Sequence, residues 1–418
     1  MSAQLLEIVE SFEPQPLYCV IAWCSRRIYA PGRQLLGVQS LPVAYIEYIM
    51  GTKKVHHSTL LALPNTVWGI VVGLGGNAIL WKTVATHRFT RKVLGRSGQW
   101  AFFGVGGILW IILSLLTVAK VVTNFEFCCR EWRCGVRIYF FNMMNVSLFM
   151  YAIAVPATLE EAWRAARTAA FCVASLMQIG FNLEVYRRWL FSNDASLAGA
   201  VPQYMLSTVG WALGCLLAQE LDLDRRWRIG VAELMIGCAV AFYFLAAISV
   251  IQGLAEKPHL KGEPVLFLFL APPSVSATCF ANFNSGKFQG VPVAVLGYCL
   301  MLFLVLLLSG PKLAGEPKIL GAYWAYVFPV AALGSACVNY AAYEDSPATK
   351  AVAWVVFAIA ETMLVAVFAR AMYHHVRVMQ GRAIWRDPLA PAYTLVDESA
   401  GRPCDDREAK SSEVTNPA

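Results

Sequence analysis

Residues 68–81 read WGIVVGLGGNAILW, a run of apolar residues and glycines with no charged side chain. It lies within a longer apolar stretch at 61–84, and a transmembrane helix needs about 20 mostly apolar residues. Only helices and closed barrels satisfy backbone polar groups in hydrocarbon, and these stretches lack the two-residue alternation of barrel strands. The sequence therefore predicts an all-α polytopic membrane protein. Ten spans are expected, at 61–84, 100–123, 138–157, 166–190, 200–220, 230–253, 263–283, 291–310, 319–342 and 351–372.

Composition supports a membrane setting and excludes several classes of function. Of the 418 residues, 58% are hydrophobic and 15% are charged, whereas soluble domains carry about 25% charged residues. The net charge of +7 is scattered over short loops and tails, which argues against nucleic-acid binding. No P-loop, HExxH or GxSxG pattern is present, so we expect no enzyme activity and no cofactor. The cysteines do not form paired zinc-ligand motifs, so no metal site is expected.

The chain divides into a transmembrane region and two polar tails. We expect a cytosolic N-terminal tail at 1–58, a ten-helix channel domain at 59–378, and a disordered cytosolic C-terminal tail at 379–418. An even number of spans places both termini on one side of the membrane. Lys and Arg are more numerous on the side of the termini, which by the positive-inside rule is the cytosol.

Glycine and proline interrupt several odd-numbered spans: Gly73, Gly210, Pro272, Pro273 and Pro329. Proline inside a helix removes a backbone hydrogen bond and bends the helix. The freed carbonyl must face protein or a water-filled cavity, which suits bent helices around a pore. Alternatively, the small residues allow close packing of helices. Both interpretations remain open from the sequence.

Uncharged polar residues inside the spans are candidates for lining such a pore. Hydroxyl groups and helix N-terminal dipoles supply partial positive charge that an anion can use. The alternative is that each hydroxyl bonds back to its own helix. The candidates are Asn142, Ser207, Thr208, Ser274, Ser276 and Thr278.

Glu361 is the one ionisable residue expected near the middle of a span. A carboxylate there costs about 3 kcal/mol on insertion scales unless it is paired or protonated. It is either a proton or cation coupling site or a structural contact between helices, and the absence of further acidic groups favours the structural role. Lys82, Lys120 and Arg370 are expected to snorkel from span ends, and Glu184 and Glu220 to reach the interface.

Seven stretches, in order along the chain, resemble segments of the slow anion channel family of plants and its bacterial relative TehA. The most specific are GLGGNAILWK (73–82), PQYMLSTVGWALGCLLA (202–218), EPVLFLFLAPPSVSA (263–277) and YWAYVFPVAAL (323–333). The resemblance implies five helical hairpins, with the odd-numbered helices around a central pore in each subunit, and assembly as a homotrimer. It also implies a pore closed by a phenylalanine before a proline in helix 9, here Phe328 and Pro329.

The chain departs from the family pattern at several expected pore positions, among them Asn142, Met144, Asn182, Met205 and Trp211. The expected function is a passive channel for chloride, nitrate or similar anions in the plasma membrane. Alternatives are a malate or other C4-dicarboxylate transporter and a non-transporting membrane scaffold. Kinases act on the tails of plant relatives, so a protein kinase is an expected partner. Candidate phosphorylation sites are Ser11, Ser411 and Ser412.

Overall fold

The computed structural model describes residues 65–123, 125–133, 138–191, 202–256, 264–309 and 323–379. The candidate regulatory serines Ser11, Ser411 and Ser412 lie outside the described residues. So do both predicted tails, apart from residue 379.

Every expected span coincides with a helix, which confirms the all-α polytopic prediction. The first five are α4 (Trp68–Thr86), α6 (Ser97–Thr123), α8 (Ile138–Ala154), α9 (Arg164–Phe191) and α10 (Met205–Glu220). The next five are α11 (Arg225–Glu256), α12 (Ala271–Phe283), α13 (Val291–Leu308), α15 (Trp324–Glu344) and α16 (Pro347–Met379).

Within the described ranges, eight helical segments are long and apolar enough to cross a membrane. The two remaining helices are α8, with 17 residues, and α10, with 16. Both are buried among the other helices along most of their length. The count of ten spans therefore remains a prediction.

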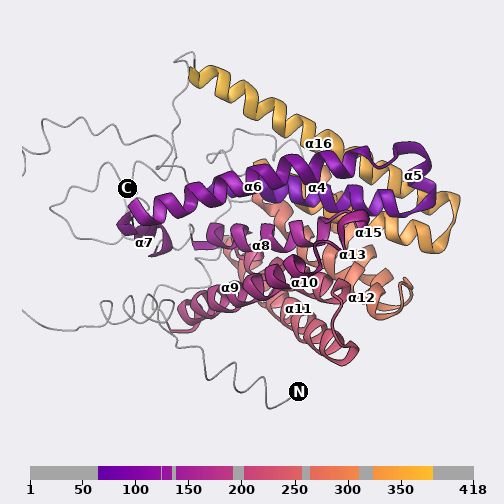
Figure 1. The fold of residues 1–418 in the computed structure, drawn as a ribbon, viewed down its shortest axis with the longest axis horizontal. Coiled ribbons are helices and arrows are strands. Elements are labelled where there is room, and N and C mark those ends of the chain that lie inside the picture. The colour runs from indigo at the N-terminus through magenta and orange to yellow at the C-terminus, as the bar shows by residue number, and fades with distance from the viewer. Residues whose placement is uncertain are drawn as a thin grey trace, which may run out of the picture. The chain divides into compact units, whose positions relative to one another are not determined.

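The helices pack as five sequential pairs: α4 with α6, α8 with α9, α10 with α11, α12 with α13, and α15 with α16 (Figure 1). The first member of each pair also contacts the first members of two other pairs. These contacts close a ring in the order α4, α8, α10, α12, α15 and back to α4. The five first members are called the inner helices below. Their ring agrees with the predicted arrangement of five hairpins.

Short helices and turns connect these elements. They are η1 (Asn65–Val67), α5 (Arg88–Leu94), α7 (Phe125–Arg133), η2 (Ala157–Leu159), η4 (Pro202–Tyr204) and η6 (Pro264–Leu270). Pro272 and Pro273 occupy the first turn of α12, directly after η6. The first turn tolerates proline because its N–H groups have no partner within the helix. The two prolines thus mark a change from 3₁₀ to α-helix, whereas Pro329 lies inside α15 as expected.

Glycines bring α4 unusually close to α15. A Cβ atom added to Gly73 would lie 2.7 Å from Cε3 of Trp324, and one added to Gly76 would lie 2.9 Å from Cδ2 of Phe328. Gly76 also faces backbone, because its added Cβ would lie 3.2 Å from the Cα of Phe328. Between helices in a membrane, van der Waals packing replaces the hydrophobic effect, so this close approach is a main source of cohesion. This contact is consistent with the packing interpretation of Gly73.

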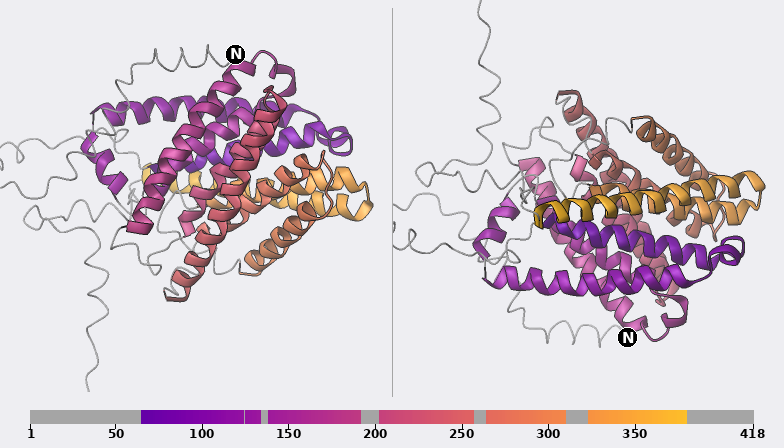
Figure 2. Two further views of the ribbon diagram at one scale, coloured as in Figure 1. Left: turned by 90° about the horizontal axis from the view of Figure 1, so that it is seen from below. Right: turned by 90° about the horizontal axis from the view of Figure 1, so that it is seen from above.

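A buried ion pair joins helices at the N-terminal end of α4. Lys120 at the end of α6 pairs with Glu131 of α7, and both side chains are at most 5% exposed. The Nδ2 atom of Asn65 donates a hydrogen bond of 3.2 Å to the same carboxylate. Lys120 was expected to snorkel into the interface, but a carboxylate partner within the protein satisfies its charge instead. Outside the ring, α16 runs alongside α4 (Figure 2).

Replacing Gly76 by alanine should lower the melting temperature of the purified protein in detergent. The added methyl group would overpack the α4–α15 contact, which typically costs about 1–3 kcal/mol. Gly237→Ala in α11 is the matched control, because an added Cβ there meets nothing within 4 Å. Alanine favours helix by about 1 kcal/mol relative to glycine, so the control should melt at the same temperature or higher. Equal melting temperatures for the two variants would refute the proposed role of Gly76.

Candidate functional site

A cavity of about 450 Å³ lies inside the ring of inner helices. All five inner helices or the residues directly following them contribute to its lining. The lining extends from near the middle of these helices, at Gly76, Val275 and Phe328, toward their C-terminal ends. Helix N-terminal dipoles, which were expected to favour anions, therefore do not point into this cavity. The partial charge of a helix C-terminus is negative, so any anion here requires other positive groups.

Four of the inner helices contribute a narrow stripe of residues to the cavity, and α8 contributes Ile153 alone. Residues three or four apart lie on the same face of a helix, and the lining follows this spacing. The stripes are Gly76, Ile79, Thr83 and His87 on α4; Leu213, Leu216 and Glu220 on α10; Val275, Thr278 and Asn282 on α12; and Phe328, Ala332, Ser335 and Asn339 on α15. In every stripe apolar residues come first and polar residues follow toward the helix C-terminus. The cavity therefore has an apolar floor and a polar mouth.

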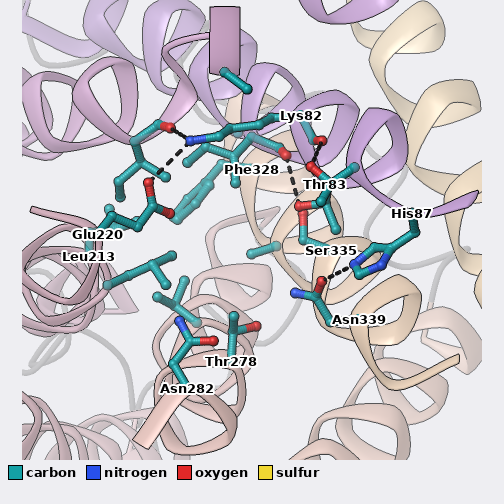
Figure 3. Close-up of a pocket in the computed structure, with 18 of the residues that line it drawn as sticks. Lys82, Thr83, His87, Leu213, Glu220, Thr278, Asn282, Phe328, Ser335 and Asn339 are labelled. Atoms are coloured by element: carbon teal, nitrogen blue, oxygen red, sulfur yellow. Dashed lines mark hydrogen bonds and ion pairs between the residues drawn. The ribbon is translucent and has the colours of Figure 1, made fainter. Parts of the chain in front are cut away.

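The floor consists of the first lining residue of each inner helix: Gly76, Ile153, Leu213, Val275 and Phe328. Phe328 is the largest of them, and only 2% of its surface is exposed. Its side chain points into the site beneath Lys82 (Figure 3). Gly76 leaves room for the ring, as the short distance to an added Cβ shows. The ring thus packs against α4 and lines the apolar end of the cavity.

Lys82 carries positive charge at the mouth of the cavity. Its Nζ atom lies 2.9 Å from Oε1 of Glu160 and 3.1 Å from Oε2 of Glu220. It also donates a hydrogen bond of 2.7 Å to the carbonyl oxygen of Ile153 (Figure 3). Lys82 was expected to snorkel away from its helix end. Instead, it links α4 to the C-terminus of α8, to the turn that follows α8, and to α10.

Arg167 of α9 completes this charged group. Its Nη2 atom lies 2.6 Å from Oε2 of Glu220, and its Nε atom donates to the carbonyl oxygen of Ala152 at 2.9 Å. Arg167 and Lys82 therefore cap two carbonyls at the C-terminal end of α8, where backbone acceptors lack partners within the helix. Lys82, Glu160, Arg167 and Glu220 are called the mouth network below. Two cations and two carboxylates make its formal charge zero.

The carboxyl group of Glu160 belongs to the turn between α8 and α9. Burial alone would raise its pKa, but the hydrogen bond and charge of Lys82, together with the charge of Arg167, outweigh burial and lower the pKa. Glu160 is therefore ionised at neutral pH. Its interaction with Lys82 is present above the ordinary pKa of a glutamate and is lost only as the pH falls through the lowered value.

The structure places the candidate pore residues away from this cavity, with one exception. Ser207, Thr208 and Ser276 donate to carbonyl oxygens three or four residues earlier in their own segments, as the alternative interpretation predicted. Asn142 donates to the carbonyl oxygen of Leu206. Asn142, Ser207, Thr208, Ser274 and Ser276 are buried and do not line the cavity, whereas Thr278 does.

Gly210 and Glu361 both occupy contacts between helices. A Cβ added to Gly210 would lie 2.1 Å from Oε1 of Gln178, so this glycine makes room for a neighbouring side chain of α9. Glu361 of α16 accepts a hydrogen bond of 2.8 Å from Nε1 of Trp81. Neither residue lines the cavity. Glu361 thus forms a contact between α16 and α4, as expected if its role is structural.

Several lining residues were missed in the sequence, including His87, Asn282, Ser335 and Asn339. Nε2 of His87 lies 2.8 Å from Oδ1 of Asn339, which joins α4 to α15 at the mouth. The helical spacing of polar residues in the C-terminal half of each odd-numbered span was the available signal. The ion pair between Lys82 and Glu220 had no such signal, because its partners are 138 residues apart.

Comparison with known proteins identifies the family. The sequence profile of the voltage-dependent anion channel family matches residues 63–372. The chain is 26% identical over 329 residues to S-type anion channel SLAH2 of Arabidopsis thaliana, covering 75% of this chain and 60% of that protein. It is 27% identical over 335 residues to the guard cell S-type anion channel SLAC1 of the same plant, covering 78% of this chain and 58% of that protein.

The chain thus spans about three fifths of the length of these two relatives. The profile match extends from before α4 into α16 and includes every helix that lines the cavity. Because the match covers well over half of the sequence, the chain belongs to the voltage-dependent anion channel family.

Proposed function

We propose that the protein is a passive anion channel whose conduit runs through the ring of inner helices and is closed by Phe328. The observation that carries this proposal is the cavity inside the ring, with an apolar floor to which Phe328 contributes the largest side chain. Its relatives are anion channels by name. A cavity of this kind, open at one end and blocked at the other by one aromatic ring, fits a closed channel.

The floor blocks ions for two physical reasons. The ring of Phe328 fills the space sterically, and the neighbouring side chains of Ile153, Leu213 and Val275 offer no hydrogen bonds to water. A narrow apolar constriction excludes water, and ions cannot pass without it. A change in the rotamer of Phe328 would remove the steric block, because aromatic side chains occupy discrete wells.

The charge of the lining supports a small monovalent anion as the permeant ion. Lys82 is the one Lys or Arg among the described residues that line the cavity, and two carboxylates accompany it. A dicarboxylate such as malate carries two negative charges, and among the described lining residues no pair of Lys or Arg side chains is present to offset them. The mouth network instead has a formal charge of zero, so transport of malate is the less favoured alternative.

Orientation, membrane and assembly are further parts of the proposal. With both termini in the cytosol, α4 runs outward, and the cavity opens to the exterior of the cell. The family resemblance supports the plasma membrane, a homotrimer and control by a protein kinase. One apolar face of α6, which includes Val105, Ile108, Ile112 and Leu115, is exposed on the single chain, so lipid or a neighbouring subunit must cover it.

Replacing Phe328 by alanine should increase anion current in a voltage clamp, because it removes the bulk of the floor. The matched control is Phe303→Ala in α13, which truncates an equally buried phenylalanine that does not line the cavity. The control should lose stability by about 3–5 kcal/mol, as expected for a buried phenylalanine, without a gain in current. Unchanged current in Phe328→Ala, at equal surface expression, would refute the gate.

Replacing external chloride by nitrate should shift the reversal potential of Phe328→Ala, while replacing it by malate should abolish inward movement of anion. Weakly hydrated anions such as nitrate give up less hydration free energy than malate does when they enter a narrow uncharged constriction. The measurement is the reversal potential in bilayers that contain the purified protein. A larger malate than nitrate permeability, or a current that requires a proton gradient, would favour the dicarboxylate carrier.

A further inference from the structure

Lys82 is a largely buried lysine whose side chain lines the cavity. Its side chain is 16% exposed and lies near Phe328 in Figure 3. An ammonium group has three donors, and three oxygen atoms accept from Lys82: those of Ile153, Glu160 and Glu220. A permeating anion therefore can reach this ammonium group only by replacing one of these acceptors.

The three acceptors differ in how firmly they are held. The carbonyl oxygen of Ile153 belongs to the backbone of α8 and cannot move away. Glu220 belongs to α10 and is also held by Arg167 at 2.6 Å. Glu160 lies in a turn, and 39% of its side chain is exposed. Among the described residues, Lys82 is its one ion-pair partner. Glu160 is thus the acceptor that can leave at least cost.

We propose that the ammonium group of Lys82 is a binding site for a small monovalent anion, and that the carboxylate of Glu160 occupies this site as a tethered competitor. The inference rests on the proposed anion conduction. A carboxylate presents a charged oxygen to the ammonium group in the way that a planar oxyanion such as nitrate does. When the Glu160 side chain swings toward solvent, nitrate or chloride takes its place beside Lys82 and above the floor.

Electrostatics explains why the competitor matters. With Glu160 in place the mouth network is neutral, so an anion in the cavity meets no net attraction and the carboxylate repels it. Without Glu160 the network carries one positive charge at the entrance. A side chain on a short tether also acts at an effective concentration of about millimolar or more, so permeant anions must compete at similar concentrations.

The test is chloride binding to purified protein in detergent, measured as excess broadening of the chloride NMR resonance. Glu160→Gln keeps the shape of the side chain and removes its charge. It should tighten chloride binding about two- to fivefold, the factor expected for a partly exposed ion pair. Added nitrate should compete with the bound chloride. Glu161→Gln is the matched control, because Glu161 is the next residue, pairs with Arg164 and does not line the cavity.

The double variant Lys82→Gln/Glu160→Gln should lose the gain, since it removes the proposed site together with the competitor. It leaves no uncompensated charge between the two positions, so it should fold as Glu160→Gln does. Unchanged chloride binding in Glu160→Gln would overturn the inference, as would a gain that persists in the double variant.

Conductance, measured separately, distinguishes this inference from the proposed function. Anion current without a change in chloride binding would overturn only the role of Glu160 and Lys82. The predicted changes in binding without anion current in Phe328→Ala would support the site and overturn the channel.

Discussion

The close approach of α4 to α15 is the constraint on which the rest of the structure depends. Gly73 and Gly76 have no side chains to separate the two helices, and Trp324 and Phe328 fill the space that they leave. Because lipid provides no hydrophobic force between helices, this contact depends on van der Waals packing, and we expect it to be sensitive to a single added methyl group. The same contact holds Phe328 inside the ring. Cohesion of the fold and the proposed closure of the conduit therefore depend on the same atoms.

A second constraint comes from the ends of the inner helices. Five helix C-termini surround the mouth, and their carbonyl groups make this region electronegative. The positive charges of Lys82 and Arg167 offset this negative potential. Both side chains donate hydrogen bonds to carbonyl oxygens of α8 and form ion pairs with Glu160 and Glu220. The mouth network thus joins five segments, α4, α8, the turn after α8, α9 and α10, and it places positive charge at the mouth of the cavity. The two cations and the two carboxylates compensate each other in this arrangement.

Much of the fold could be predicted from the sequence, because span length and apolar content are local properties of the chain. The ten ranges coincide with helices, and the position of Phe328 followed from the family resemblance. Pairing between distant residues could not be predicted in this way. Lys82 and Lys120 were both expected to snorkel, yet each has a carboxylate partner on another segment. Ser207, Thr208, Ser274 and Ser276 do not line the cavity, whereas Thr278 does, because each helix turns only one narrow stripe inward and the sequence alone did not fix which stripe.

Accessibility on the two sides of Phe328 tests the central claim most directly. Ser335→Cys places a thiol in the cavity, and Val209→Cys places one a turn below Leu213 on α10, beyond the floor. A water-soluble thiol reagent applied at the mouth, with the parent protein as the background for native cysteines, should modify Ser335→Cys whether or not Phe328 is present. It should modify Val209→Cys only when Phe328 is also replaced by alanine. Equal modification of Val209→Cys with and without Phe328 would contradict the account.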